Sequence, residues 1–249
     1  MRWLNSATQV VLKLPIFLVL FGCGSIDYSR VVETSKFDGR LFVMWVGEGS
    51  AYSGDGRFVF IPNPNDPLTF TRLDNLGNVI GQPIRPEIMY TDGGSIPRLA
   101  TVFKGLSPWG YAPAYMVHDW LFIAHHCNVD GTPTEEEKRM SDLNFSDSAI
   151  IMAEAIKSLQ VSGQVQNNDV SGFAVSSAVS GPISRSLWNR KGACEGHRVS
   201  KEHKAAALEA FPRSIAAVPE DVGLEPLDLL TEDFDADSDK AILIGEFGF

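Results

Sequence analysis

Basic residues are scarce in this 249-residue sequence. It contains 21 Lys and Arg against 31 Asp and Glu, which gives a formal net charge of -10. Because nucleic-acid binding is driven mainly by basic side chains that displace counterions from phosphates, this balance argues against a nucleic-acid partner. The acidic excess is concentrated near the C-terminus, where residues 213–249 are predicted to form a solvated, flexible tail. A cation-binding role for this tail is the alternative.

Cysteine is equally scarce, since the chain has only Cys23, Cys127 and Cys194. No second cysteine stands at metal-binding spacing, which argues against a cysteine-based zinc site. The sequence also lacks an internal repeat. At this length, one domain with appendages is therefore the expected organisation.

The N-terminus has the pattern of an export signal. Arg2 and Lys13 precede an apolar run at 14–21, which ends at Cys23 with a small residue before it. This pattern resembles a bacterial lipobox, in which Cys23 is diacylated and becomes the first mature residue. In a Gram-negative cell, Gly24 after the cysteine indicates an outer-membrane anchor with the domain facing the periplasm. An ordinary secretory signal and a short membrane anchor are the alternatives.

Lipidation of Cys23 would leave Cys127 and Cys194 as an even pair in an oxidising compartment. We therefore predict a disulfide between them. It would close a loop of more than sixty residues, and the chain-entropy treatment assigns such a loop about 4 kcal/mol of stabilisation. Two buried free thiols are the alternative.

The order of patterns along the chain predicts an α+β fold. β-rich runs at 39–46, 57–61 and 68–72 are separated by turn residues, which favours a small antiparallel sheet within residues 37–90. Helical patterns follow at 112–126 and 134–160, and their short connection predicts an antiparallel hairpin with further short helices after it. The predicted organisation is a signal segment at 1–23, a tether at 24–36, a single domain at 37–212 and the tail at 213–249.

The first predicted helix contains the chain's best functional lead. Residues 112–124 are apolar on every face except at His118 and Asp119, and a helix that is apolar all round is a buried one. Burying an imidazole and a carboxylate without partners costs several kcal/mol. The pair is therefore expected to meet other polar groups, a metal ion or a solvent-filled cleft.

Asp142 is the predicted partner of His118. It extends the buried stripe of the second helix by one step, and each residue stands eight positions from the connection between the helices. The two side chains should then face each other, with His118 as a general base and Asp142 as the carboxylate that orients it. Asp119 lies about 100° further round the first helix and is free to bind a cation.

A turn ahead of this helix offers further candidate groups. Gly93 and Gly94 permit close backbone approach, and Asp92 and Ser95 can bond the amides of the turn. Such a turn could line a cation or oxyanion site, whereas a purely structural turn explains the same residues. A triad of Ser95 with His118 and Asp142 is a further alternative, although Ser95 lacks a nucleophile-elbow context.

Three motifs in this order resemble a phage-associated bacterial family, the domain of unknown function 1353. They are Asp-Gly-Gly-Ser-Ile-Pro at 92–97, His-Asp-Trp-Leu-Phe at 118–122 and Ser-Asp-Leu-Asn-Phe at 141–145. The resemblance covers residues 37–160. It brings no established activity to this chain.

A looser resemblance is to the secreted phospholipases A2, which also place His-Asp on one helix and an Asp on the antiparallel partner. It implies that His118 activates water, Asp119 binds calcium and Asp142 orients His118. The chain departs from that family because it has neither the glycine-rich calcium loop nor the cysteine lattice. Gly93 and Gly94 would have to take the place of the loop.

Two functions from different classes therefore remain open. The first is a lipid-anchored envelope hydrolase that acts on an ester or amide, with calcium as the possible cofactor. The second is a non-catalytic envelope lipoprotein of phage or prophage ancestry, in which His118, Asp119 and Asp142 form a buried structural network. A metal site formed by His118 and His125, seven residues apart on one helix, is a further alternative.

Overall fold

The computed structural model describes residues 26–47, 57–91, 110–165, 175, 177–215 and 240–249. Antiparallel sheets and several helices confirm the predicted α+β fold. In chain order the elements are η1 Tyr28–Arg30, β1 Lys36–Asp38, β2 Arg40–Gly47, β3 Arg57–Pro62, β4 Thr69–Thr71, β5 Met89–Thr91, α1 Ala112–Asp130, α2 Glu135–Lys138, α3 Phe145–Val161, α5 Pro182–Trp188, α6 Cys194–His197, α7 Lys201–Ile215 and β6 Lys240–Gly248.

The larger sheet has the strand order β5-β3-β2-β6, and all of its neighbouring strands are antiparallel. β1 and β4 form a separate antiparallel pair. β2, β3 and β4 fall on the three β-rich runs predicted from the sequence. Local turn chemistry and β-branched or aromatic residues therefore suffice to place these strands.

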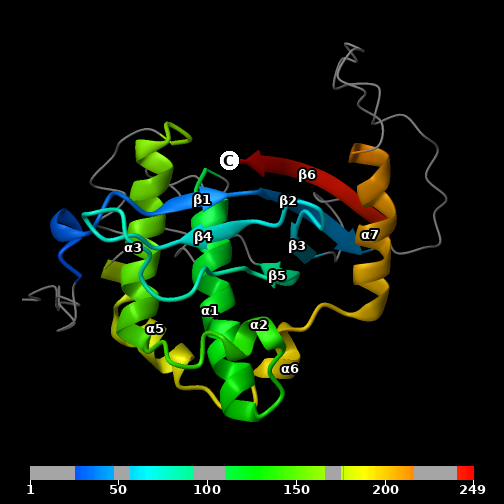
Figure 1. Cartoon of the computed structure of the whole chain (residues 1–249). Coiled ribbons are helices and arrows are strands. Elements are labelled where there is room, and N and C mark those ends of the chain that lie inside the picture. The colour runs from blue at the N-terminus through cyan, green and yellow to red at the C-terminus, as the bar shows by residue number, and fades with distance from the viewer. Residues whose placement is uncertain (1–25, 48–56, 92–109, 166–174, 176, 216–239) are drawn as a thin grey trace, which may run out of the picture.

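β2 is buried on both of its faces because helices cover both sides of the larger sheet. Leu41 and Val43 belong to the core formed with α1 and α3, whereas Phe42 and Met44 face a second core that includes Ala207 of α7. Alternate strand residues point to opposite faces, so a strand covered on both sides is apolar throughout. Figure 1 shows α7 beside β2 and β6, and α1 and α3 side by side.

α1 is buried over most of its surface, as its sequence predicts, and a partly exposed strip runs along it through Asp119, Phe122 and His125. Pro113 occupies its first turn, where a missing N–H costs nothing. The helix ends at Asp130, four residues beyond the predicted end, because Gly131 adopts a left-handed φ of 80° and its N–H bonds to the carbonyl of Cys127.

The prediction of one continuous helix at 134–160 is wrong. α2 starts at a capping box formed by Thr134 and Glu137 but ends at Lys138. α3 then starts at a second capping box: the side chain of Asn144 accepts the N–H of Asp147, and the side chain of Asp147 accepts the N–H of Asn144. Satisfying these amides locally favours a new helix start over continuation of the first helix.

The two chain ends also differ from prediction. Tyr28, placed in a tether at 24–36, is only 4% exposed in the main core, and its hydroxyl donates to the Gln160 side chain at 3.0 Å. The predicted tail contains β6, which pairs with β2 from Lys240 to Gly248. Residues 240–249 are therefore part of the domain, and its predicted limits of 37 and 212 are both too narrow.

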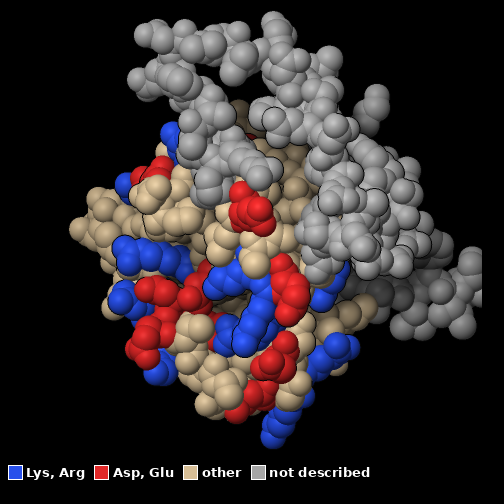
Figure 2. All heavy atoms as spheres, turned by 90° about the vertical axis from the view of Figure 1, so that its right-hand side faces the viewer, with Lys and Arg blue, Asp and Glu red and all other residues tan. Residues whose placement is uncertain are grey.

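The surface seen from the α7 side mixes charges of both signs. Figure 2 shows Lys and Arg interspersed with Asp and Glu over the described part of this face, without a broad area of one sign. None of the described helices is both long and apolar enough to cross a membrane.

Candidate functional site

His118 lies near the middle of α1 and is only 6% exposed. Its Nδ1 faces Oδ1 of Asp119 at 3.4 Å. A carboxylate oxygen accepts a hydrogen bond and cannot donate one, so this contact favours the imidazole tautomer with the proton on Nδ1 and a lone pair on Nε2. The Asp119 side chain is 29% exposed, so its carboxylate connects the buried imidazole with solvent.

Two buried polar atoms on this helix lack a hydrogen-bond partner. Among the atoms of the described residues, Nε2 of His118 and the hydroxyl of Tyr115 are both in this condition. Tyr115 is 4% exposed and stands three residues before His118, so the two side chains share one helix face. An unpaired buried polar atom costs about 1–3 kcal/mol, so a polar ligand that reached either atom would be stabilised there.

The hydroxyl of Tyr115 is a strong candidate donor at this place. Burial raises the pKa of Tyr115 well above its ordinary value, and the charges of Tyr111 and Asp119 raise it further. The phenol therefore stays protonated at physiological pH. Its O–H is available to an acceptor oxygen of a ligand.

The predicted position of Asp142 is wrong. Its side chain is exposed, in the turn between α2 and α3, whereas His118 is buried. The prediction depended on a helix that continues through 139–144, and the capping box at Asn144 ends that continuity. Asp119, which the sequence assigned to a different direction, is the carboxylate that faces His118.

Other predicted site residues lie outside the described part of the chain. These are Cys23 and the turn residues Asp92, Gly93, Gly94 and Ser95. The lipid anchor, the calcium site and the serine triad therefore stay predictions. Within the described ranges, no group of three or more His, Cys, Asp or Glu is arranged to bind a metal ion.

The histidines that follow His118 on α1 belong to an aromatic cluster. His125 stacks on Trp188 with ring centroids 4.0 Å apart, and burial lowers the pKa of His125. Phe122 meets the same tryptophan edge-on, at 4.9 Å, and also packs on the ring of His118. The stacking on Trp188 gives His125 a packing role. His125 is not at the end of the helix, because α1 continues to Asp130.

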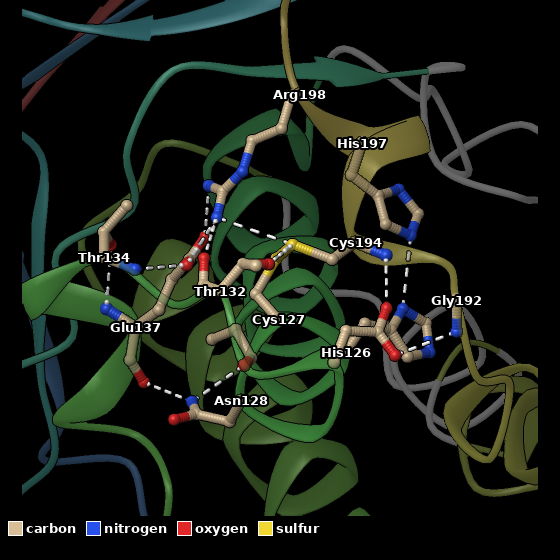
Figure 3. The surroundings of a disulfide bond; sticks show 12 residues. His126, Cys127, Asn128, Thr132, Thr134, Glu137, Gly192, Cys194, His197 and Arg198 are labelled. Atoms are coloured by element: carbon tan, nitrogen blue, oxygen red, sulfur yellow. Dashed lines mark hydrogen bonds and ion pairs between the residues drawn. A yellow bond between two sulfur atoms is a disulfide. The ribbon is translucent and has the colours of Figure 1, made fainter.

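A disulfide between Cys127 and Cys194 confirms the predicted pairing and joins α1 to α6 (Figure 3). Both carboxylate oxygens of Asp130 accept backbone N–H bonds from the segment that carries Cys194, from Gly192 at 2.8 Å and from Cys194 at 3.0 Å. Nη2 of Arg198 donates to the carbonyl of Thr132 at 3.1 Å. The disulfide is thus surrounded by contacts that fix the α6 segment on the end of α1.

His197 and Arg198 are residues that the sequence reasoning missed. Nε2 of His197 lies 3.2 Å from Nδ1 of His126, and Arg198 forms an ion pair with the buried Glu137. The signal available in the sequence was the disulfide prediction itself. A bond between Cys127 and Cys194 necessarily brings the residues that flank each cysteine close together.

Comparison of the chain with protein-family models, curated proteins and solved structures finds no match.

Proposed function

We propose that this protein is an exported, lipid-anchored hydrolase of the cell envelope that cleaves an ester or amide through His118. The observation that carries the proposal is the state of the imidazole. It is buried, its Nδ1 faces a carboxylate, and its Nε2 has no partner among the described residues. A general base that activates water requires this division of roles between the two nitrogens.

The chemistry follows from the two unpaired atoms. A water molecule donates a hydrogen bond to Nε2 of His118, which takes its proton as the water oxygen attacks a carbonyl carbon. The carboxylate of Asp119 stabilises the imidazolium that forms, and the O–H of Tyr115 donates to the negative oxygen of the tetrahedral intermediate. His118 then returns the proton to the leaving group. The 3.4 Å contact with Asp119 is long for a hydrogen bond, as catalytic contacts often are before a ligand binds.

Export is supported by the disulfide. Structural disulfides persist in oxidising compartments and are rare in a reducing cytosol. Together with the lipobox-like segment that ends at Cys23, the pairing of Cys127 with Cys194 supports a domain that faces the periplasm.

A non-catalytic envelope lipoprotein of phage or prophage ancestry is the second candidate. It is favoured by the packing of the His118 ring on Phe122, with centroids 4.9 Å apart, and by the low exposure of His118. In this alternative the imidazole is only a packing group of the protein interior. The protein then acts by binding a partner and not by catalysis.

Replacing His118 with Asn separates the two functions. The purified protein would be assayed with p-nitrophenyl esters of short and long acyl chains and with chromogenic amides. As a hydrolase, it should lose activity by about 100-fold or more in His118→Asn. The exposed Asp142 provides a matched control, and Asp142→Asn should retain full activity.

Thermal unfolding of the same variants supplies the second measurement. Nε2 of His118 has no partner to lose, so His118→Asn in a hydrolase should change the free energy of unfolding by no more than about 1 kcal/mol. A larger loss, with no hydrolysis by the wild type, would identify a structural role. Calcium titration belongs in the same series, because stabilisation that disappears in Asp119→Asn would support the predicted calcium ligand.

A further inference from the structure

His126 and His197 present two imidazole nitrogens to each other beside the disulfide. Nδ1 of His126 lies 3.2 Å from Nε2 of His197, and the two rings are almost parallel, with an interplanar angle of 7°. Figure 3 shows the two side chains meeting between α1 and α6. His126 is 3% exposed, whereas His197 is partly exposed, so the pair is reached from the His197 side.

The tautomer of His126 is fixed by its other nitrogen. Nε2 lies 2.9 Å from the carbonyl of Leu187, which can only accept a hydrogen bond. Nε2 therefore carries the proton, and Nδ1 presents a lone pair to His197. A histidine that ligates a metal is commonly held in this way, by a carbonyl that accepts the N–H of its distal nitrogen.

The disulfide holds the two imidazoles in a fixed position relative to each other. Cys127 directly follows His126, and Cys194 stands three residues before His197, so the disulfide ties together the two segments that carry the pair. Asp130 binds the N–H of Cys194 and anchors the same segment a second time. The separation of the two nitrogens is thus fixed without any ligand, which reduces the entropy lost when a ligand binds.

We propose that His126 and His197 bind a divalent transition-metal ion of the zinc and copper class, through Nδ1 of His126 and Nε2 of His197, with water completing the coordination. Zinc to imidazole bonds of about 2.0–2.1 Å at a tetrahedral angle place two ligand nitrogens about 3.3 Å apart. The nitrogens of this pair already stand at 3.2 Å. Imidazole is a preferred ligand of zinc, copper and nickel, whereas calcium and magnesium prefer oxygen.

The charges around the pair include groups of both signs. The carboxylate of Asp119 acts electrostatically on His197, and that of Asp130 acts on His126. Arg190 and Arg198 also act on His197 and oppose a cation. The charge of Arg198 is balanced by its ion pair with Glu137, so the two carboxylates are opposed mainly by Arg190.

Titration of Zn²⁺ into tag-free, chelator-treated protein tests the proposal by calorimetry. The wild type should bind one Zn²⁺ per chain, and His197→Gln should weaken the association at least tenfold. His203→Gln is the matched control, because His203 is also partly buried but is hydrogen-bonded to Tyr90 instead. His118→Asn should keep full Zn²⁺ binding, so the outcome is independent of the proposed hydrolase.

Electron paramagnetic resonance with Cu²⁺ identifies the ligands. Two coordinated imidazole nitrogens are expected in the wild type and one at most in His197→Gln. Should His197→Gln fail to fold, ¹⁵N spectra of the wild type replace it, since Zn²⁺ should shift the signals of Nδ1 of His126 and Nε2 of His197. Absence of Zn²⁺ and Cu²⁺ binding by the wild type, or binding unchanged by His197→Gln, would show that the pair forms only a hydrogen bond.

Discussion

Arg198 forms a two-point ion pair with Glu137, from Nη1 to Oε1 at 2.6 Å and from Nη2 to Oε2 at 2.8 Å. Glu137 is fully buried, at 0% exposure, and its carboxylate also accepts the backbone N–H of Thr134 at 2.7 Å. The pair therefore ties the segment between α6 and α7 to the capping box that begins α2. It does so next to the disulfide (Figure 3).

Loss of Arg198 should strongly destabilise the protein. Arg198→Ala leaves the carboxylate of Glu137 buried without a counter-charge, and removing one partner of a buried pair costs about 3–5 kcal/mol. Because the Arg198 side chain is 33% exposed, we expect the free energy of unfolding to fall by about 3 kcal/mol, the lower end of this range. Urea unfolding measures this loss. The exposed Arg190 is the control, and Arg190→Ala should change the stability by about 0.5 kcal/mol at most. Equal effects of the two variants would contradict a structural role for the pair.

Removal of the disulfide should lower the free energy of unfolding by about 4 kcal/mol, because its two cysteines are separated by 67 residues of sequence. The measurement is urea unfolding of the double variant Cys127→Ala and Cys194→Ala against the oxidised wild type. The wild type under reducing conditions is the matched control and should lose a similar amount. Full stability after reduction would contradict the pairing of these cysteines.

The parts of the fold that the sequence predicts correctly are those fixed by local chemistry. The strands β2, β3 and β4 are bounded by turn residues, and α1 is apolar on every face of its first part except at His118 and Asp119. The break between α2 and α3 was also readable, because Asn144 and Asp147 repeat the capping pattern of Thr134 and Glu137. The apolar spacing continues through the break, however, and following that spacing placed Asp142 on a buried face.

The parts that were missed depend on contacts between distant segments. β6 follows an acidic stretch, and its partner β2 lies about two hundred residues earlier in the chain. The burial of Tyr28 likewise requires α3, which contributes Gln160. At the candidate site, the arrangement of Tyr115, His118 and Asp119 depends on side-chain directions within one helix, which periodicity alone does not determine.

The carboxylate of Asp130 should make stability depend on pH in acid. Hydrogen bonds from the N–H groups of Cys194 and Gly192 hold the pKa of Asp130 below its ordinary value. Because the folded pKa is the lower one, the stabilisation is fully present above the unfolded pKa and is lost as pH falls through the folded pKa. The difference in unfolding free energy between the wild type and Asp130→Asn should therefore shrink below about pH 4. A difference that stays constant down to pH 2 would contradict this assignment.

Deletion of residues 240–249 should expose the edge of β2 and parts of both cores. β6 pairs with β2 from Lys240 to Gly248, and Phe247 packs against the main core. We expect the melting temperature to fall by about 10 °C or more, with association of the shortened chain visible by size-exclusion chromatography. Ile244→Thr is the control, since this side chain is 41% exposed and should tolerate the change. A stable, monomeric shortened chain would contradict a structural role for β6 in the domain.

Gly39 should be among the least replaceable residues of the sheet. It joins β1 to β2 with a φ of +86°, and a Cβ built on it would lie 2.7 Å from the carbonyl carbon of Pro67 and even nearer to that residue's oxygen. Gly77 is the matched control, since it has a φ of +83° with nothing within 4 Å of the same position. Gly77→Ala measures only the cost of placing a Cβ on a left-handed backbone. It should lower the free energy of unfolding by about 1–2 kcal/mol.

Gly39→Ala adds a collision with main chain that cannot rotate away, so it should cost about 1–3 kcal/mol more than Gly77→Ala. The backbone around this glycine has little room to move, because the N–H of Arg40 donates to the carbonyl of Asp66 at 2.8 Å and the carbonyl of Gly39 accepts from Phe249 at 3.1 Å. Urea unfolding of the two alanine variants measures the difference directly. Equal costs would mean that the segment at Pro67 moves away freely, and the close approach of Gly39 to Pro67 would then contribute nothing to stability.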